Sequence, residues 1–222
     1  MKIRLALALL LLAPFIASAA DLNPAESTAL LKKLQEMREK QPAAQADFKE
    51  EKNTHLLNKP IVTEGTVSFD APGKFRREVK GGNASMSVSN GKVMWVYYPN
   101  FKEAEHYSIG QRTFFDDAMA ALTAGLNFEH IEEYYNFKAS KDASGYQFQL
   151  TPKKANLKRI LDHLDIWMDN DFKVQKTALY QQKKGDRIVT NYSNVRHLNS
   201  LPASTFEFTP PADAHVSYPL GK

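Results

Sequence analysis

Few side chains in this sequence have the types and spacing that catalysis or metal binding needs. His130-Ile131-Glu132-Glu133 combines a His with carboxylates, but it lacks the paired His spacing of helical zinc-protease motifs. A second acidic group resembles a calcium cluster without the central Gly and final Glu of an EF-hand loop. Its members are Asp162, His163, Asp165, Asp169 and Asp171. Strand alternation would place Asp162 and His163 on opposite faces, so we interpret this group as a solvated hairpin.

The other common signatures of catalysis are also missing. The chain has no Cys, which excludes disulfides, thiol catalysis and thiolate metal sites. It has no Gly-x-Ser-x-Gly elbow and no phosphate-binding glycine loop. A secreted hydrolase remains an alternative, because catalytic triads assemble from distant residues. We nevertheless expect no enzyme, no catalytic residues, no metal and no cofactor.

The first twenty residues have the pattern of a signal peptide. Lys2 and Arg4 precede the apolar run from Leu5 to Ile16, and the small residues 17–20 follow it. The run is too short for a stable membrane span. We therefore expect cleavage after Ala19 or Ala20, which divides the chain into a signal peptide over residues 1–20 and a single domain over residues 21–222.

Length and charge limit the function classes further. Without Lys2 and Arg4, 27 of the 29 basic residues remain against 25 acidic residues, so the mature chain is nearly balanced. It shows no basic tail or stripe of the kind that nucleic-acid binding needs. A chain of this length can bury a substantial core without disulfides.

The stretch from Val93 to Tyr98 is apolar on both faces of a predicted strand. A turn signal, Asn90-Gly91, precedes it and Pro99 ends it. Alternation puts three side chains on each face: Val93, Trp95 and Tyr97 on one, and Met94, Val96 and Tyr98 on the other. A one-sided sheet would alternate apolar with polar residues. The pattern indicates either a sheet wrapped around a cavity or an ordinary central strand covered on both sides.

The remaining elements frame this strand. Asn23 caps a helix over residues 24–40, with Pro24 at its first position and Glu26 reaching back to the cap. Short strands with turns between them predict an antiparallel meander over residues 46–57, 62–69, 74–80, 84–90 and 93–98. Further strands are expected from about residue 134 and over residues 146–152, 160–168, 172–181 and 187–195, with a last element at 206–208.

A second helix is expected over residues 114–122. Thr113 is its candidate cap, and one face carries Phe115, Met119 and Leu122. Such a stripe usually completes a core, and the alternative is a movable lid.

Taken in order, these pieces resemble the LolA family of periplasmic outer-membrane lipoprotein carriers over nearly the whole mature chain. The matching pieces are the N-terminal helix, residues 65–75 around Pro72, residues 89–92 leading to Trp95-Val96-Tyr97-Tyr98-Pro99, residues 135–138, residues 148–153, residues 156–158, residues 206–211 and Val216.

The resemblance implies a mainly β fold with some helix: a curved, incompletely closed antiparallel β-barrel whose helices form a lid over an apolar cavity. It also implies a monomer that accepts lipoprotein acyl chains from an inner-membrane ATP-driven extractor and passes them to an outer-membrane receptor. The alternatives are a periplasmic sensor or adaptor, or a dedicated carrier of another lipid, built on the same fold. The expected cavity lining is Phe69, Phe75, Trp95, Tyr97, Phe148 and Leu150, with Phe115, Met119 and Leu122 from the lid.

Two positions depart from the family pattern. Several members have Arg before the strand Pro, where it holds the lid shut, and here that residue is Ala71. Arg77 stands where a Trp is frequent. We predict that Arg77 takes over part of the lid-holding role by binding lid carbonyls or an acidic residue such as Asp116 or Asp117. The alternative is a rim residue that bonds only water.

Overall fold

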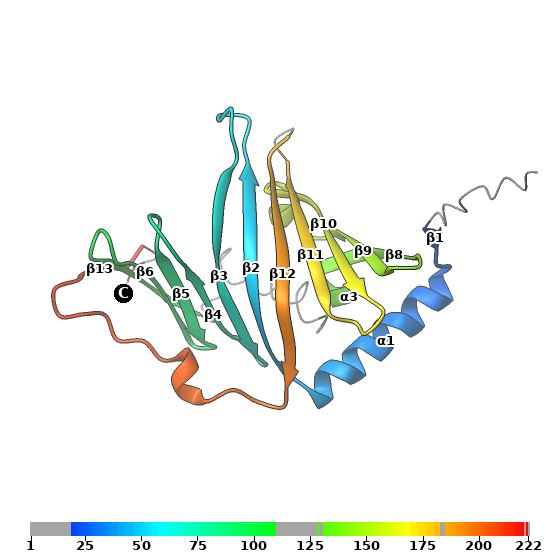
Figure 1. Ribbon diagram of the computed structural model, residues 1–222, viewed down its shortest axis with the longest axis horizontal. Helices are drawn as coiled ribbons and strands as arrows, with labels where there is room; N and C mark the ends of the chain where they lie inside the picture. The colour runs from blue at the N-terminus through cyan, green and yellow to red at the C-terminus, as the bar shows by residue number, and fades with distance from the viewer. Residues whose placement is uncertain (1–18, 110–127, 129–130, 183–184, 220, 222) are drawn as a thin grey trace, which may run out of the picture.

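The computed structural model describes residues 19–109, 128, 131–182, 185–219 and 221. These residues form one sheet of 13 strands in the order β1-β8-β9-β10-β11-β12-β2-β3-β4-β5-β6-β7-β13 (Figure 1). Its strands are β1 (Ala20–Asp21), β2 (Ala43–Asn53), β3 (Ile61–Asp70), β4 (Lys74–Val79), β5 (Ser85–Asn90), β6 (Val93–Tyr98), β7 (Glu103–Ser108), β8 (Tyr135–Lys141), β9 (Gly145–Pro152), β10 (Leu161–Asp169), β11 (Val174–Gln181), β12 (Arg187–Leu198) and β13 (His215–Ser217). The described helices are α1 (Pro24–Lys40), α3 (Ile131–Tyr134), α4 (Ala155–Lys158) and the short 3-10 helix η1 (Ala203–Phe206).

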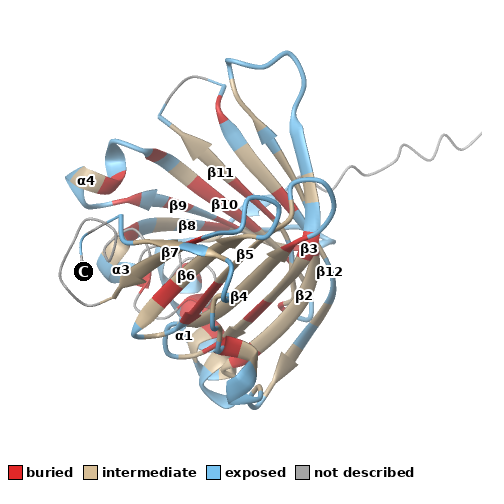
Figure 2. Cartoon of the chain, turned by 90° about the vertical axis from the view of Figure 1, so that its left-hand side faces the viewer, coloured by how far each residue is buried: buried red, intermediate tan, exposed pale blue. Residues whose placement is uncertain are grey.

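Two meanders make up the sheet. Strands β2 to β7 follow one another in space as they do in sequence, and so do β8 to β12. The meanders join where β2 pairs antiparallel with β12, at the centre of Figure 1. The outermost strands, β1 and β13, are not paired with each other, so the curved sheet is an incompletely closed barrel, as predicted (Figure 2).

Helix α1 begins and ends where the sequence predicts. The Asn23 side chain accepts a hydrogen bond from the Glu26 amide at 3.0 Å, and the Glu26 carboxylate accepts one from the Asn23 amide at 2.9 Å. The helix ends before Pro42, as expected when a proline follows. This capping box fixes the start of the helix independently of the sheet.

The main hydrophobic core lies between α1 and the second meander. Leu30, Leu31 and Leu34 of α1 pack against Phe148 and Leu150 of β9 within one buried cluster. Full burial of an aliphatic or aromatic side chain of this size contributes about 1.5–3 kcal/mol. We call the sheet face that α1 covers the inner face, and the opposite one the outer face.

The C-terminal strap, residues 199–219, covers part of the outer face of the first meander. The Phe208 ring lies 6.0 Å from that of Trp95 and 5.4 Å from that of Tyr97, between ring centres. Arg76 donates from Nη1 to the Thr205 carbonyl at 3.2 Å. Strand β13 then extends the sheet edge parallel to β7. This strap explains why β6 is apolar on the face that points away from α1.

Several local expectations need correction. β1, β7 and β13 are not among the predicted elements, and the expected element at residues 206–208 is the end of η1 followed by extended chain. Asp162 and His163 do not point to opposite faces: Nδ1 of His163 lies 2.7 Å from the Asp162 carboxylate. The cause is a register irregularity between Leu161 and His163, which interrupts the alternation.

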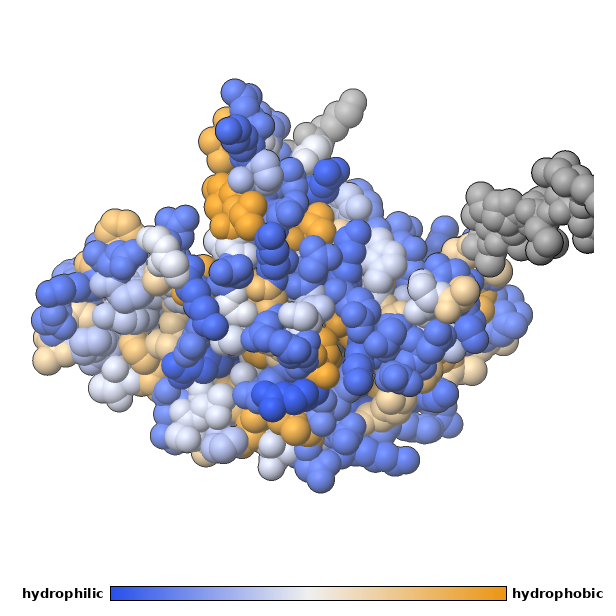
Figure 3. Space-filling view, viewed as in Figure 1, coloured by the Kyte–Doolittle hydropathy of each residue, from blue (hydrophilic) through white to orange (hydrophobic). Residues whose placement is uncertain are grey.

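The hairpin of β2 and β3 projects from the sheet (Figure 1). Its tip is held to the β11–β12 turn, because the Asp186 carboxylate accepts a hydrogen bond from the His55 amide at 2.6 Å. Leu56, Leu57 and Val62 are exposed there, and Figure 3 shows hydrophobic atoms on this projection. Among the described helices, none is long and apolar enough to cross a membrane.

Gly65 lies where β3 and β4 approach too closely for any side chain. A Cβ atom built there would lie 1.7 Å from the Glu78 carbonyl oxygen and 3.1 Å from Cε1 of Phe48. We expect Gly65→Ala to lower the free energy of unfolding by about 1–3 kcal/mol. The opposing atom belongs to the backbone of a hydrogen-bonded strand and cannot easily move aside. Urea unfolding of the two proteins measures this difference.

Gly82→Ala is the matched control, since a Cβ there meets nothing within 4 Å. It should change the unfolding free energy by less than about 0.5 kcal/mol. Equal stability of the two variants would contradict the close approach.

Candidate binding site

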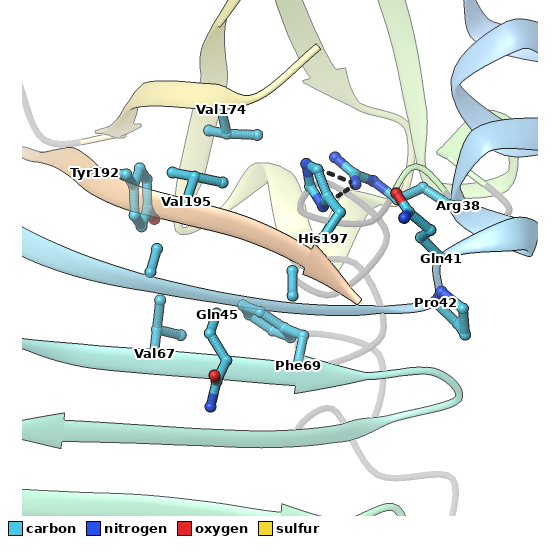
Figure 4. A pocket seen from close by; sticks show the side chains of 12 residues that line it. Arg38, Gln41, Pro42, Gln45, Val67, Phe69, Val174, Tyr192, Val195 and His197 are labelled. Atoms are coloured by element: carbon cyan, nitrogen blue, oxygen red, sulfur yellow. Dashed lines mark hydrogen bonds between the residues drawn. The ribbon is translucent and has the colours of Figure 1, made fainter. Parts of the chain in front are cut away.

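A pocket opens on the inner face beside the end of α1, where the two meanders meet (Figure 4). It encloses about 70 Å³. Its walls come from α1 and the residues after it, from β2, β3 and β12, and from the start of β11. The lining residues are Arg38, Gln41, Pro42, Ala44, Gln45, Ala46, Val67, Phe69, Val174, Tyr192, Val195 and His197.

Two alanines on β2 create the room for this pocket. Ala44 pairs with Phe69 on one side and with His197 on the other, and Ala46 pairs with Val67. Directly paired residues share a face, so the larger side chains of β3 and β12 flank a strip of β2 that carries only methyl groups. The arrangement leaves a depression with largely apolar walls.

The mouth of the pocket carries a cation and a neutral imidazole. Nη1 of Arg38 lies 2.5 Å from Nδ1 and 3.0 Å from Nε2 of His197. Burial lowers the pKa of His197 to about 4, with Arg38 and Lys173 acting in the same direction and Asp169 opposing them. His197 is therefore neutral near pH 7 and has one ring nitrogen that can accept from the guanidinium.

A polar network lies farther along the inner face. Nη2 of Arg77 lies 3.0 Å from the Glu50 carboxylate, and the guanidinium covers the Phe48 ring at 4.3 Å. The other Glu50 oxygen accepts from the Thr190 hydroxyl at 3.2 Å. Glu50 thus partners a cation that would otherwise face apolar neighbours.

The lid-holding role of Arg77 remains a prediction. Its suggested partners, Asp116 and Asp117, lie outside the described residues, as do Phe115, Met119 and Leu122 of the expected lid. The described structure adds a different partner, Glu50, and so replaces the alternative of a rim residue bonded only to water.

The predicted lining residues divide into three groups. Phe69 lines the pocket, and Phe75 lies beside it with 6.3 Å between ring centres. Phe148 and Leu150 are on the same face but are fully buried under α1, in the core. Trp95 and Tyr97 lie on the outer face under Phe208, away from this pocket.

The register explains this placement. Phe75 pairs with Ser89, which in turn pairs with Met94, whereas Arg76 pairs with Val88, which in turn pairs with Trp95. Met94 therefore shares the inner face with Phe75. Because β6 is apolar on both faces, its sequence gives no indication of which face is inner.

A second hollow lies on the outer face between β5, β6 and the C-terminal strap. It encloses about 250 Å³ and is lined by Val88, Asn90, Val93, Trp95 and residues 206–209. Although it is larger, polar Asn90, Glu207 and Thr209 share its lining, and it lies on the face away from α1. We therefore take the inner-face pocket as the candidate for an apolar ligand.

The residues that sequence reasoning missed are those at the mouth. Arg38 reads as one of several charges on an amphipathic helix, and His197 lies beyond the predicted end of its strand. The signal that could have found the pocket is Ala43-Ala44-Gln45-Ala46, a run of small residues in a predicted strand whose neighbours carry large apolar side chains.

Comparisons with known proteins agree on one family. The sequence profile described as "Outer membrane lipoprotein carrier protein LolA" matches residues 39–209. Relatives named outer-membrane lipoprotein carrier protein include one from Dechloromonas aromatica, 26% identical over 172 residues that cover 77% of this chain and 79% of the relative. Another, from Bordetella avium, is 25% identical over 213 residues, 95% of this chain and 94% of the relative.

A solved structure supports the fold alone. An uncharacterized conserved protein from Thermus thermophilus superimposes with a TM-score of 0.53 at 12% identity. The match covers 86% of this chain and 99% of that chain. At this identity the likeness describes how the sheet is built and not what the pocket binds.

His197 makes stability depend on pH. Its ordinary pKa is 6.5 and its folded pKa is about 4, so between these values the unfolded chain binds a proton that the folded chain does not. Stability should therefore fall as the pH drops from about 6.5 towards 4. After discounting for the partial exposure of His197, we expect a loss of about 1–2 kcal/mol.

Urea unfolding at pH 7 and at pH 4.5 measures this loss, and His197→Gln is the comparison because Gln keeps an acceptor without titrating. From pH 7 to pH 4.5 the free energy of unfolding should fall less in the variant than in the wild type, and the difference should be the ~1–2 kcal/mol assigned to His197. If both proteins lose the same stability, other groups carry the dependence.

Proposed function

Because the chain belongs to the LolA family of outer membrane lipoprotein carrier proteins, we propose that it binds the acyl chains of lipoproteins and carries them from the inner to the outer membrane. The observation that carries the proposal is the inner-face pocket, whose apolar walls lie between α1 and the sheet. An acyl chain gains about 0.8 kcal/mol for each methylene that leaves water.

The size of the pocket indicates how such a ligand would enter. At about 70 Å³ it is far smaller than the ~300–1,000 Å³ of pockets that enclose a small molecule. The sheet is held by continuous ladders, whereas the end of α1 meets it through side chains such as Arg38 and His197. Ligand binding therefore requires the end of α1 to move away from the sheet. When the helix end returns, it buries the apolar walls again, and this favours release of the ligand.

The finer parts of the proposal follow the family pattern. Residues 1–20 direct export, and the mature chain works in the periplasm as a monomer. It accepts cargo from an inner-membrane ATP-driven extractor and gives it to an outer-membrane receptor. It performs no chemistry on the cargo and needs no metal or cofactor.

Direct binding tests the proposal. The exported protein should bind a fluorescent fatty-acid probe with one-to-one stoichiometry, and an acylated peptide should displace it. Ala46→Leu fills the space over β2 and should weaken binding about four- to fifteenfold, since it removes room for one or two methylenes. Ala25→Leu, at an exposed position on α1, is the matched control and should bind as the wild type does.

Folded protein that binds no acyl probe would exclude the carrier function. Transfer of acylated cargo between donor and acceptor membranes then separates a carrier from a protein that only detects acyl chains. A protein that binds but never transfers belongs to the second kind.

The positions of the two tryptophans give a further prediction. Trp95 lies under Phe208 on the outer face, and Trp167 pairs with Lys176, whose ammonium lies 4.4 Å from the centre of its ring. Saturating acyl ligand should leave the wild-type emission spectrum unchanged, because neither ring lines the pocket. Phe69→Trp places a reporter in the pocket wall and should respond with a shifted spectrum.

The Phe69→Trp substitution is made in a variant that also carries Trp95→Phe and Trp167→Phe, so that the emission comes from the new Trp alone. A ligand-dependent shift in the wild type, with none in the Phe69→Trp reporter, would move the binding site to the outer face.

A further inference from the structure

Arg38 is the feature of the pocket that apolar cargo does not explain. Its guanidinium projects from the last turn of α1 across the mouth towards His197 (Figure 4). Only Nη1 has a partner among the described residues. None of its nitrogens is both buried and unpartnered, so the remaining N–H groups are open to solvent or to a ligand.

The charge of Arg38 has no counterion in the described part of the chain. No carboxylate there lies within ion-pair distance of it, and its hydrogen-bond partner is a neutral imidazole. Arg38 is partly withdrawn from water, and a charge that loses part of its hydration gains from a counterion. Burial lowers the pKa of Arg38 to about 10, which still leaves the guanidinium charged at neutral pH.

The helix dipole does not account for this placement. A cation in the last turn of a helix is favoured by the dipole. Lys40 lies in the same turn and is exposed, so it provides that interaction without being buried. Arg38 instead lies at the rim of an apolar pocket, and near His197 the charge of Lys173 is opposed by that of Asp169, which makes no ion pair with Arg38.

We propose that Arg38 holds the anionic head group of a ligand whose acyl chain lies against Val67, Phe69 and Tyr192. A carboxylate or phosphate accepts charge-assisted hydrogen bonds from the free N–H groups of the guanidinium. The anion then supplies the counterion that the described residues lack. The ligand class is an anionic single-chain or phosphate-bearing lipid, and this inference rests on the acyl binding of the proposed function.

Chain-matched ligands test the head group separately from the chain. Dodecanoate, dodecyl phosphate and dodecanol are compared by displacement of a neutral fluorescent probe, N-phenylnaphthylamine. The wild type should bind at least one of the anions about tenfold more tightly than dodecanol. Arg38→Met should remove this preference, which is read as the ratio of the anion affinity to the dodecanol affinity within the same variant.

Arg196→Met is the matched control. Arg196 is adjacent to His197 on β12 but points to the outer face, where it donates to Gln45 at 3.1 Å. Arg196 does not line the pocket, although its partner Gln45 does, so Arg196→Met removes the same charge and the preference for anions should persist. Thermal unfolding of each variant shows whether it is folded, and Arg38→Lys, which keeps the charge, should retain part of the preference.

The outcomes are distinct. Tighter binding of dodecanoate than of dodecyl phosphate indicates a fatty-acid head group. Tighter binding of dodecyl phosphate indicates a phospholipid head group. Equal affinity for all three ligands in the wild type, or an anion preference that survives Arg38→Met, overturns the proposal while the carrier function stands. Binding of none of them overturns the carrier function, and the head-group site falls with it.

Discussion

The pairing of β2 with β12 is the contact on which the rest of the structure depends. Each meander is built from hairpins that form locally, and this pairing is what joins them into one sheet. It also brings Ala44 of β2 beside His197 of β12, which creates the pocket where the two halves meet. A sheet lacking this pair would keep a core under α1 but would have no binding wall.

The inner face is less uniform than a simple apolar cup. Near α1 the second meander presents buried Phe148, Leu150 and Ile166. Towards the β2–β3 hairpin the same face carries Glu50 and Arg77. Burial raises the pKa of Tyr192, which lies between the two regions and keeps its hydroxyl protonated near Thr177. Along the inner face, an apolar core under α1 is followed by the pocket and then by the Glu50–Arg77 ion pair.

Local signals predicted the local structure well. The capping box of α1 and the Gly, Pro and Asn turns placed the helix and most strands, because each signal acts within a few residues. The same sequence could not assign Trp95 to a face, since both faces of β6 are apolar and only the position of the C-terminal strap distinguishes them. Arg38 and His197 meet from opposite ends of the chain, so no spacing pattern records their contact.

The strand order also bears on how the sheet assembles from its N-terminal end. Strand β2 emerges early and can pair with β3 at once, but its other edge waits for β12, which comes near the end of the chain. An unpaired edge exposes backbone groups that can recruit other chains. Lys49, Glu51 and Lys52 lie along that waiting edge, and such charges act as gatekeepers against intermolecular pairing. The charged half of β2 therefore disfavours pairing with other chains while β12 has yet to complete the sheet.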